Sequence, residues 1–141
     1  MPDLVIEVKG GKVMVYLDKK TISHLVETFN RRDLEPAIIF ADDVVLHCPG
    51  KSRVSGTYQG KPGVIEFWQK QINLTARSFE AKVISVCQGE GALIIVMEMR
   101  VNQADETFSW QRINRYHIAD GRIVEAWIYE GDQYAADTVF A

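Results

Sequence analysis

The first candidate site of the sequence lies along one predicted strand, where alternation places Trp110, Arg112 and Tyr116 on the same face. An arginine flanked by aromatic rings can hold an anionic or carbonyl oxygen, and the rings add contact area for a ligand. The same arginine could instead pair with Glu98 or Glu125 on neighbouring strands. The pattern therefore predicts either a ligand-binding wall or a cross-strand ion pair.

His47 is the second candidate, on a short predicted strand over residues 44–48 that stops at Pro49. A neutral imidazole there could accept or donate a proton, although a histidine hydrogen-bonded within the wall of a sheet is the plainer interpretation. The three histidines lie far apart, without the spacing of metal ligands. The sequence has no glycine-rich phosphate loop and no G-x-S-x-G motif, so we expect neither a metal nor a cofactor.

Periodicity predicts the elements that position these side chains. Apolar residues at helical spacing predict helices, and short alternating runs bounded by turn residues predict strands. Gly10-Gly11 suit the tight turn of an N-terminal hairpin. The predicted helices span about 22–31, 34–40 and 62–74, and the predicted strands span 4–8, 13–17, 44–48, 56–60, 79–88, 92–102, 108–118 and 122–130.

The links between the last four predicted strands are too short for parallel crossovers, so we expect antiparallel neighbours. Helices precede this meander, which is typical of an α+β fold with the helices on one face of an antiparallel sheet. The 141 residues, of which 47% are hydrophobic, suit one domain with a well-filled core.

Composition excludes several classes of partner. The chain has 16 basic and 19 acidic residues, a net charge of −3, and so neither the basic surface of a nucleic-acid-binding protein nor a polybasic membrane patch. It has no apolar run long enough to span a bilayer, and it does not begin like a signal peptide. The two cysteines fit free thiols in a reducing compartment. We expect a soluble, cytoplasmic protein.

Several short motifs together resemble SnoaL-like proteins of the nuclear transport factor-like superfamily. They are Asp42–Gly50, Ser55–Gly60, Asp120–Glu125 and Trp127 near the end of the last predicted strand. The resemblance covers about residues 21–137 and includes the order of the predicted elements.

The resemblance implies a cone, in which a bent antiparallel sheet wraps around three helices and is open at one end. This cone domain would span residues 19–141, and the hairpin of residues 1–18 lies outside the family pattern. The tail after Asp132 is expected to close the cone or to take part in a dimer. Trp127 and Tyr129 are expected to point into the cone.

The family also implies roles for individual residues. Its polyketide cyclases use an acidic residue near the end of the sheet as acid and base, and Asp132 is the nearest match. Its epoxide hydrolases use an arginine between two aspartates, which Arg100 in Arg100-Val101-Asn102 matches only in part. Tyr58 is expected to fold over the mouth of the cone, and Trp68 to lie in the core or in the ligand wall.

We expect the cone cavity to bind a small, partly hydrophobic molecule. One hypothesis is cofactor-free isomerase or cyclase chemistry on a carbonyl compound, in which His47 or Asp132 moves the proton and Arg112 or Tyr116 holds the oxyanion. The other is a non-catalytic ligand-binding or dimerisation module of the same fold. A homodimer through the outer sheet face is expected in either case. The remaining predicted ligand contacts are Tyr58, Trp68, Arg100, Trp110, Trp127 and Tyr129.

Overall fold

The computed structural model describes residues 4–7, 13–17, 19–31 and 39–141, and all structural statements below concern these residues. The helices are α1 (Lys19–Arg31), α2 (Gly60–Leu74) and α3 (Gln133–Val139). The strands are β1 (Leu4–Glu7), β2 (Val13–Tyr16), β3 (Phe40–Cys48), β4 (Gly56–Gln59), β5 (Glu80–Gly89), β6 (Ala92–Gln103), β7 (Glu106–Ala119) and β8 (Arg122–Glu130). None of the helices described is long and apolar enough to cross a membrane.

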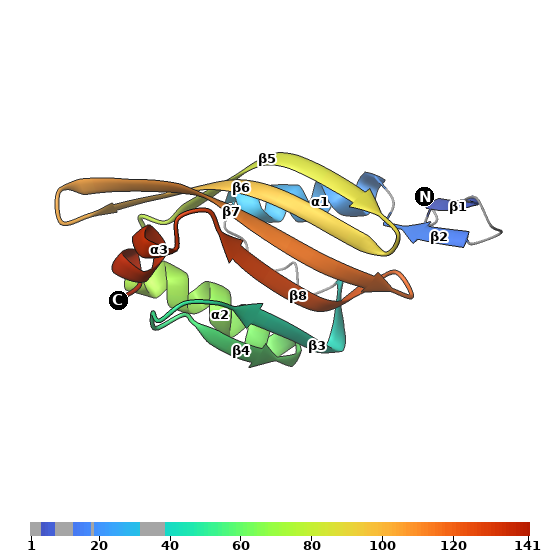
Figure 1. Cartoon of the computed structure of the whole chain (residues 1–141), viewed down its shortest axis with the longest axis horizontal. Helices are drawn as coiled ribbons and strands as arrows, with labels where there is room; N and C mark the ends of the chain where they lie inside the picture. The colour runs from blue at the N-terminus through green and yellow to red at the C-terminus, as the bar shows by residue number, and fades with distance from the viewer. Residues whose placement is uncertain (1–3, 8–12, 18, 32–38) are drawn as a thin grey trace.

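Six strands form one sheet in the order β4-β3-β8-β7-β6-β5 (Figure 1). The meander of β5 to β8 is antiparallel, as the short links predict. The expectation of a wholly antiparallel sheet is wrong, because β3 pairs with β8 in parallel. The chain passes through α2 and four further strands between β3 and β8, which supplies the long connection that a parallel pair needs.

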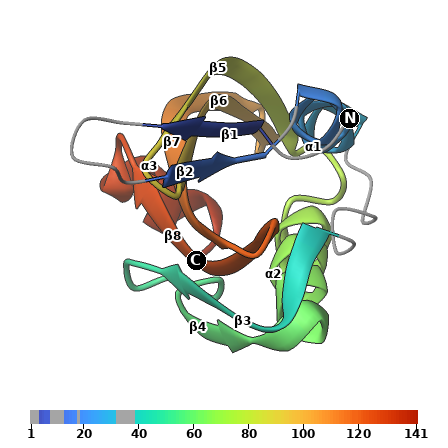
Figure 2. The same cartoon turned by 90° about the vertical axis from the view of Figure 1, so that its right-hand side faces the viewer.

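The sheet curves, and α1 and α2 lie against the face that we call the inner face (Figure 2). Side chains of β6 and β7 alternate between buried and exposed along each strand, as predicted. The inner-face residues of these two strands are Leu93, Ile95, Met97, Met99 and Val101, and Trp110, Arg112, Asn114, Tyr116 and Ile118. Because Arg112 and Asn114 belong to this set, the inner face carries polar groups within an apolar core.

Aromatic rings fill the space between the inner face and the helices. Phe29 packs on Trp68 with ring centroids 5.0 Å apart, and Trp68 packs on Phe79 at 5.8 Å. Phe140, which follows α3, lies 6.5 Å from Phe79 and 6.1 Å from Trp110. The C-terminal tail therefore packs into the interior beside the polar part of β7.

The last strand departs from the predicted alternation. Ile123 is buried, but so are Ala126 and Ile128, so the inner face changes parity along β8. The cause is a register shift, in which Ile123 and Glu125 oppose consecutive residues of β7 and leave Val124 as the extra residue of a β-bulge. Every later side chain of β8 consequently points to the opposite face from the one predicted.

Two predicted elements are only partly visible. β1 and β2 pair antiparallel, with Val5 opposite Val15, while the turn predicted at Gly10-Gly11 lies outside the described residues. The helix predicted over residues 34–40 also lies mostly outside them, and Phe40 already belongs to β3.

Candidate functional site

A buried ion pair is the centre of the polar group on the inner face. The Arg112 guanidinium donates from Nε to Glu130 Oε1 and from Nη2 to Glu130 Oε2, the latter over 3.3 Å. The two side chains are 1% and 2% exposed. Trp110 Nε1 donates to Glu130 Oε2 over 2.9 Å, and Arg112 Nη1 donates to Gln71 Oε1 on α2. Both charges are thus hydrogen-bonded as well as paired, which a buried ion pair requires.

The strand register explains how these groups meet. Glu130, the last residue of β8, stands directly opposite Arg112 on β7. The partners considered from the sequence, Glu98 and Glu125, are not those that Arg112 uses. The bulge in β8 turns Glu125 outward and Glu130 inward, and no local feature of the sequence shows that the alternation breaks there. Gln71 was also missed, because a polar residue among the apolar positions of a helix reads as solvent-facing.

A second polar pair lies two residues further along β7. Asn114 Nδ2 donates to the Tyr116 hydroxyl over 2.8 Å, and both residues are buried. Asn114 Oδ1 is buried without any hydrogen-bond partner among the described residues. Burial raises the pKa of Tyr116 well above its usual range, against smaller opposing effects of the Asn114 hydrogen bond and the Arg112 charge. Tyr116 therefore stays protonated and can donate a hydrogen bond.

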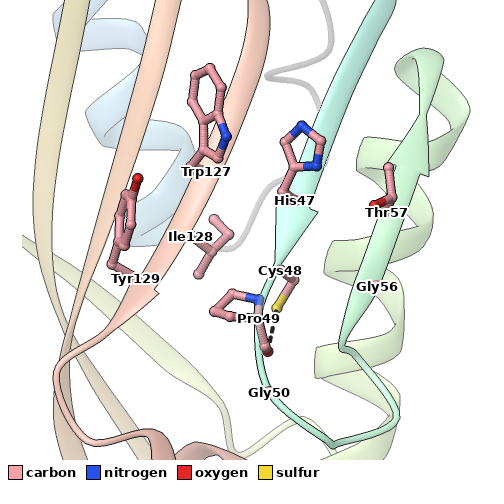
Figure 3. A pocket seen from close by; sticks show the side chains of 9 residues that line it. All are labelled: His47, Cys48, Pro49, Gly50, Gly56, Thr57, Trp127, Ile128 and Tyr129. Atoms are coloured by element: carbon pink, nitrogen blue, oxygen red, sulfur yellow. Dashed lines mark hydrogen bonds between the residues drawn. The ribbon is translucent and has the colours of Figure 1, made fainter.

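The hollow that His47 lines is on the opposite, outer face of the sheet, where β3 and β8 separate (Figure 3). Its volume is about 380 Å³, and it is lined by His47, Cys48, Pro49, Gly50, Gly56, Thr57, Trp127, Ile128 and Tyr129. The expectation that Trp127 and Tyr129 point into the interior is wrong. Tyr129 is 47% exposed, and the β8 bulge accounts for the reversal.

His47 is held in this hollow by two contacts. Its Nε2 lies 2.6 Å from Glu125 Oε2, and its ring stacks on Trp127 at 5.7 Å with the planes 24° apart. The Arg115 guanidinium lies 4.8 Å from the centroid of the Trp127 ring. The strand register puts His47 and Arg115 on the two sides of Trp127, so the three side chains form one cross-strand stack.

The other residues predicted for the site lie apart from the polar residues of the inner face and from the stack around His47. Asp132 caps α3 by accepting from the Ala135 backbone N–H over 3.0 Å. Arg100 is exposed on the outer face, opposite Ser109. Tyr58 does not cover an opening, because it is buried and donates to the Val54 carbonyl over 2.8 Å.

Trp68 and Cys48 are the remaining side chains to be placed relative to the site. Trp68 is buried in the aromatic core between Phe29 and Phe79. Burial raises the pKa of the Cys48 thiol to about 11, and the Arg112 charge opposes this rise. Cys48 is accordingly a weak nucleophile in its position between the hollow and the inner face. In the part of the chain that is described, no three histidine, cysteine, aspartate or glutamate side chains gather as metal ligands would.

A comparison with known protein families identifies the class of protein. A SnoaL-like domain family matches residues 22–126, which is most of the chain. The protein therefore belongs to the SnoaL-like family. No curated protein matches its sequence.

Solved structures agree with this assignment. Bal32a, from a soil-derived mobile gene cassette, is similar with a TM-score of 0.79 and 18% identity, over 86% of this chain and 95% of that chain. TerC, co-crystallised with polyporic acid, is similar with a TM-score of 0.73 and 17% identity, again over 86% and 95%.

IdmH from Streptomyces antibioticus, described as a proposed polyketide cyclase, is similar with a TM-score of 0.62 and 24% identity, over 79% of this chain and 89% of that chain. A loop-truncation variant of IdmH has 28% identity and a TM-score of 0.66, over 84% and 97%.

Proposed function

We propose that the protein binds a small, partly hydrophobic carbonyl compound on the inner face of its sheet. The observation that supports this most strongly is Asn114 Oδ1, a buried acceptor without a partner among the described residues, beside the Tyr116 hydroxyl. A buried polar atom left unpaired costs roughly 1–3 kcal/mol, so a ligand that donates to it recovers that energy.

The geometry suggests the chemistry of the ligand. Tyr116 accepts the Asn114 hydrogen bond and keeps its own hydrogen for a carbonyl oxygen, while Asn114 Oδ1 accepts from a neighbouring hydroxyl or enol. The positive charge of Arg112 lies on the same face and favours negative charge on that oxygen. The Phe40 ring, 5.9 Å from that of Tyr116, offers an apolar surface for the rest of the molecule.

A ligand reaches this face when the C-terminal tail moves aside. Phe140 packs against Trp110 next to the ion pair, so its ring occupies space that a ligand needs. The tail is held by few polar contacts, which include the Phe140 carbonyl accepting from the Arg53 N–H over 3.0 Å and the Val139 carbonyl accepting from Gln103 over 3.2 Å. Opening of the tail has to release Ala136, Val139 and Phe140, which are buried, so the binding energy of the ligand must offset the loss of their apolar contacts.

Binding without turnover is favoured over catalysis. Glu130 accepts three hydrogen bonds from Arg112 and Trp110, and a carboxylate so fully engaged is a poor base. The predicted proton carriers, His47 and Asp132, lie on the outer face and at the start of α3. Cofactor-free isomerase or cyclase chemistry is the second candidate, and the similarity to IdmH supports it.

We also propose a homodimer through the outer face. Ile84, Ile113 and Tyr129 are 50%, 38% and 47% exposed, and Val96 lies beside Ile113 between them. An apolar row of this kind across neighbouring strands is typical of a protein–protein interface.

Calorimetric titration with 2-hydroxyacetophenone, which has an apolar ring, a ketone and a hydroxyl, tests the binding site. We expect Tyr116→Phe to weaken binding about 5–10-fold, the value of one net hydrogen bond. The matched control Tyr134→Phe, at a position of α3 that is 84% exposed, should leave the affinity unchanged. Equal affinities of wild type and Tyr116→Phe would contradict the proposal. Product formation that is lost in Glu130→Gln would favour the catalytic candidate instead.

A further inference from the structure

We propose that the hollow on the outer face, between β3, β4 and β8, is a second binding site, and that it takes small neutral phenols. In this site the Nδ1 atom of His47 accepts the hydrogen of the phenol hydroxyl. The site is distinct from the polar group of the inner face, because none of Arg112, Asn114, Tyr116 and Glu130 lines it. Its lining combines outward-facing side chains of β3, β4 and β8 with the buried Cys48 and Ile128 (Figure 3). It therefore does not depend on the function proposed above.

The hydrogen bond to Glu125 fixes the tautomer of His47. An ionised carboxylate only accepts hydrogen bonds, so the 2.6 Å contact between Nε2 and Glu125 Oε2 places the ring hydrogen on Nε2. In the neutral ring, Nδ1 then carries a lone pair and acts only as an acceptor. No other hydrogen bond to this ring occurs among the residues described. The hollow thus contains an acceptor that suits a hydroxyl donor.

The ring is also fixed in orientation. Trp127 covers one side of His47, and Arg115 packs on Trp127 from the next strand, so the imidazole is held by a stack as well as by Glu125. Figure 3 shows the ring between Trp127 and Thr57. A preorganised acceptor loses little entropy on binding, which is the usual property of a built site.

The walls and the size of the hollow fit a single aromatic ring. Pro49 provides apolar contact, as does the ring of Tyr129, which also lies at the edge of the surface proposed above for the dimer. Thr57 provides a hydroxyl beside His47. A Cβ added at Gly56 would meet nothing within 4 Å, which shows open space on that side. A volume of about 380 Å³ is at the lower end of ligand pockets, so we expect a one-ring ligand. A neutral ligand is expected because Glu125 already faces the imidazole.

A comparison of p-cresol with toluene tests the site, since the two probes differ only in the hydroxyl. Both are titrated into the 15N-labelled protein, and the backbone amide of Thr57 and the indole N–H of Trp127 are followed by NMR. We expect p-cresol to bind at least about 5-fold more tightly than toluene and to shift these two signals. In His47→Phe, which keeps an aromatic ring on Trp127 but has no Nδ1, the preference for p-cresol should disappear.

Two further variants keep the test decisive if His47→Phe fails to fold. Glu125→Gln can donate as well as accept, so it no longer fixes the tautomer and should reduce the preference for p-cresol. The matched control Glu98→Gln, at an exposed position of β6, should leave it unchanged. Equal binding of the two probes to wild type, or shifts confined to inner-face residues, would overturn the proposal. So would a preference that survives in His47→Phe or, if that variant does not fold, in Glu125→Gln.

Discussion

The buried ion pair leads to a sharp prediction for stability. In Arg112→Met, the side chain keeps much of its length but loses its charge and its hydrogen bonds. We expect this single substitution to destabilise the protein strongly, and the double variant Arg112→Met/Glu130→Met to recover most of the loss. The reason is that a single unpaired charge in the core lowers the free energy of unfolding more than the removal of both charges does.

The expected loss in the free energy of unfolding follows from the contacts that Arg112 makes. Arg112→Met removes two hydrogen bonds to Glu130 and one to Gln71, and it leaves a carboxylate that is 2% exposed with the Trp110 indole as its partner. Breaking one side of such a pair costs about 3–5 kcal/mol. In the double variant the carboxylate is gone, and the remaining loss is about 1–2 kcal/mol for the unpaired groups of Trp110 and Gln71.

Equilibrium unfolding in urea, followed by tryptophan fluorescence, measures the free energy of unfolding of the single and the double variant under the same conditions. Glu98→Met is a suitable control, because Glu98 is exposed on the outer face of β6 and should change the free energy of unfolding by less than about 0.5 kcal/mol. A loss below about 1 kcal/mol in Arg112→Met, or a double variant no more stable than the single one, would refute the reasoning.

Three further predictions follow from other parts of the molecule. Because burial raises the pKa of Cys48 to about 11, Ellman's reagent at pH 8 should label the exposed Cys87 rapidly and Cys48 only slowly; equal rates would contradict this. Gly131→Ala should destabilise by about 1–3 kcal/mol in urea unfolding, because the new methyl group would lie 2.8 Å from a backbone carbonyl of β7, whereas Gly89→Ala meets nothing within 4 Å and should be tolerated. Ile113→Lys should convert the proposed dimer to a monomer in sedimentation velocity, and an unchanged sedimentation coefficient would argue against that interface.

The part of the fold that could be predicted is the part governed by local pattern. Alternation on β6 and β7 identified the buried set from Leu93 to Val101 and from Trp110 to Ile118. The strand over residues 122–130 has the predicted bounds. The parallel pairing of β3 with β8 could not be predicted from link lengths, because those describe sequential neighbours and not strands far apart in the chain.

Which polar side chains meet in the candidate sites depends on the strand register and on the bulge in β8, neither of which is visible in the local alternation of the sequence. Trp110, Arg112 and Tyr116 were grouped correctly because they lie on one regular strand. Trp127 and Tyr129 were assigned to the wrong face, and the contact of Trp127 with His47 was not predicted. Asn114 appeared in the same alternating set, and its free acceptor became visible only with its neighbours in place.

One extra residue in β8 therefore decides which groups can act together. With an unbroken strand, Glu125 would point to the inner face and Glu130 to the outer face, so neither carboxylate would face the basic group that it now pairs with. The bulge at Val124 instead sends Glu130 inward to Arg112 and Glu125 outward to His47. Each basic group obtains its own carboxylate, one buried and one half-exposed. The two polar groups, and with them the two proposed binding sites, are separated by the thickness of a single sheet because of this one insertion.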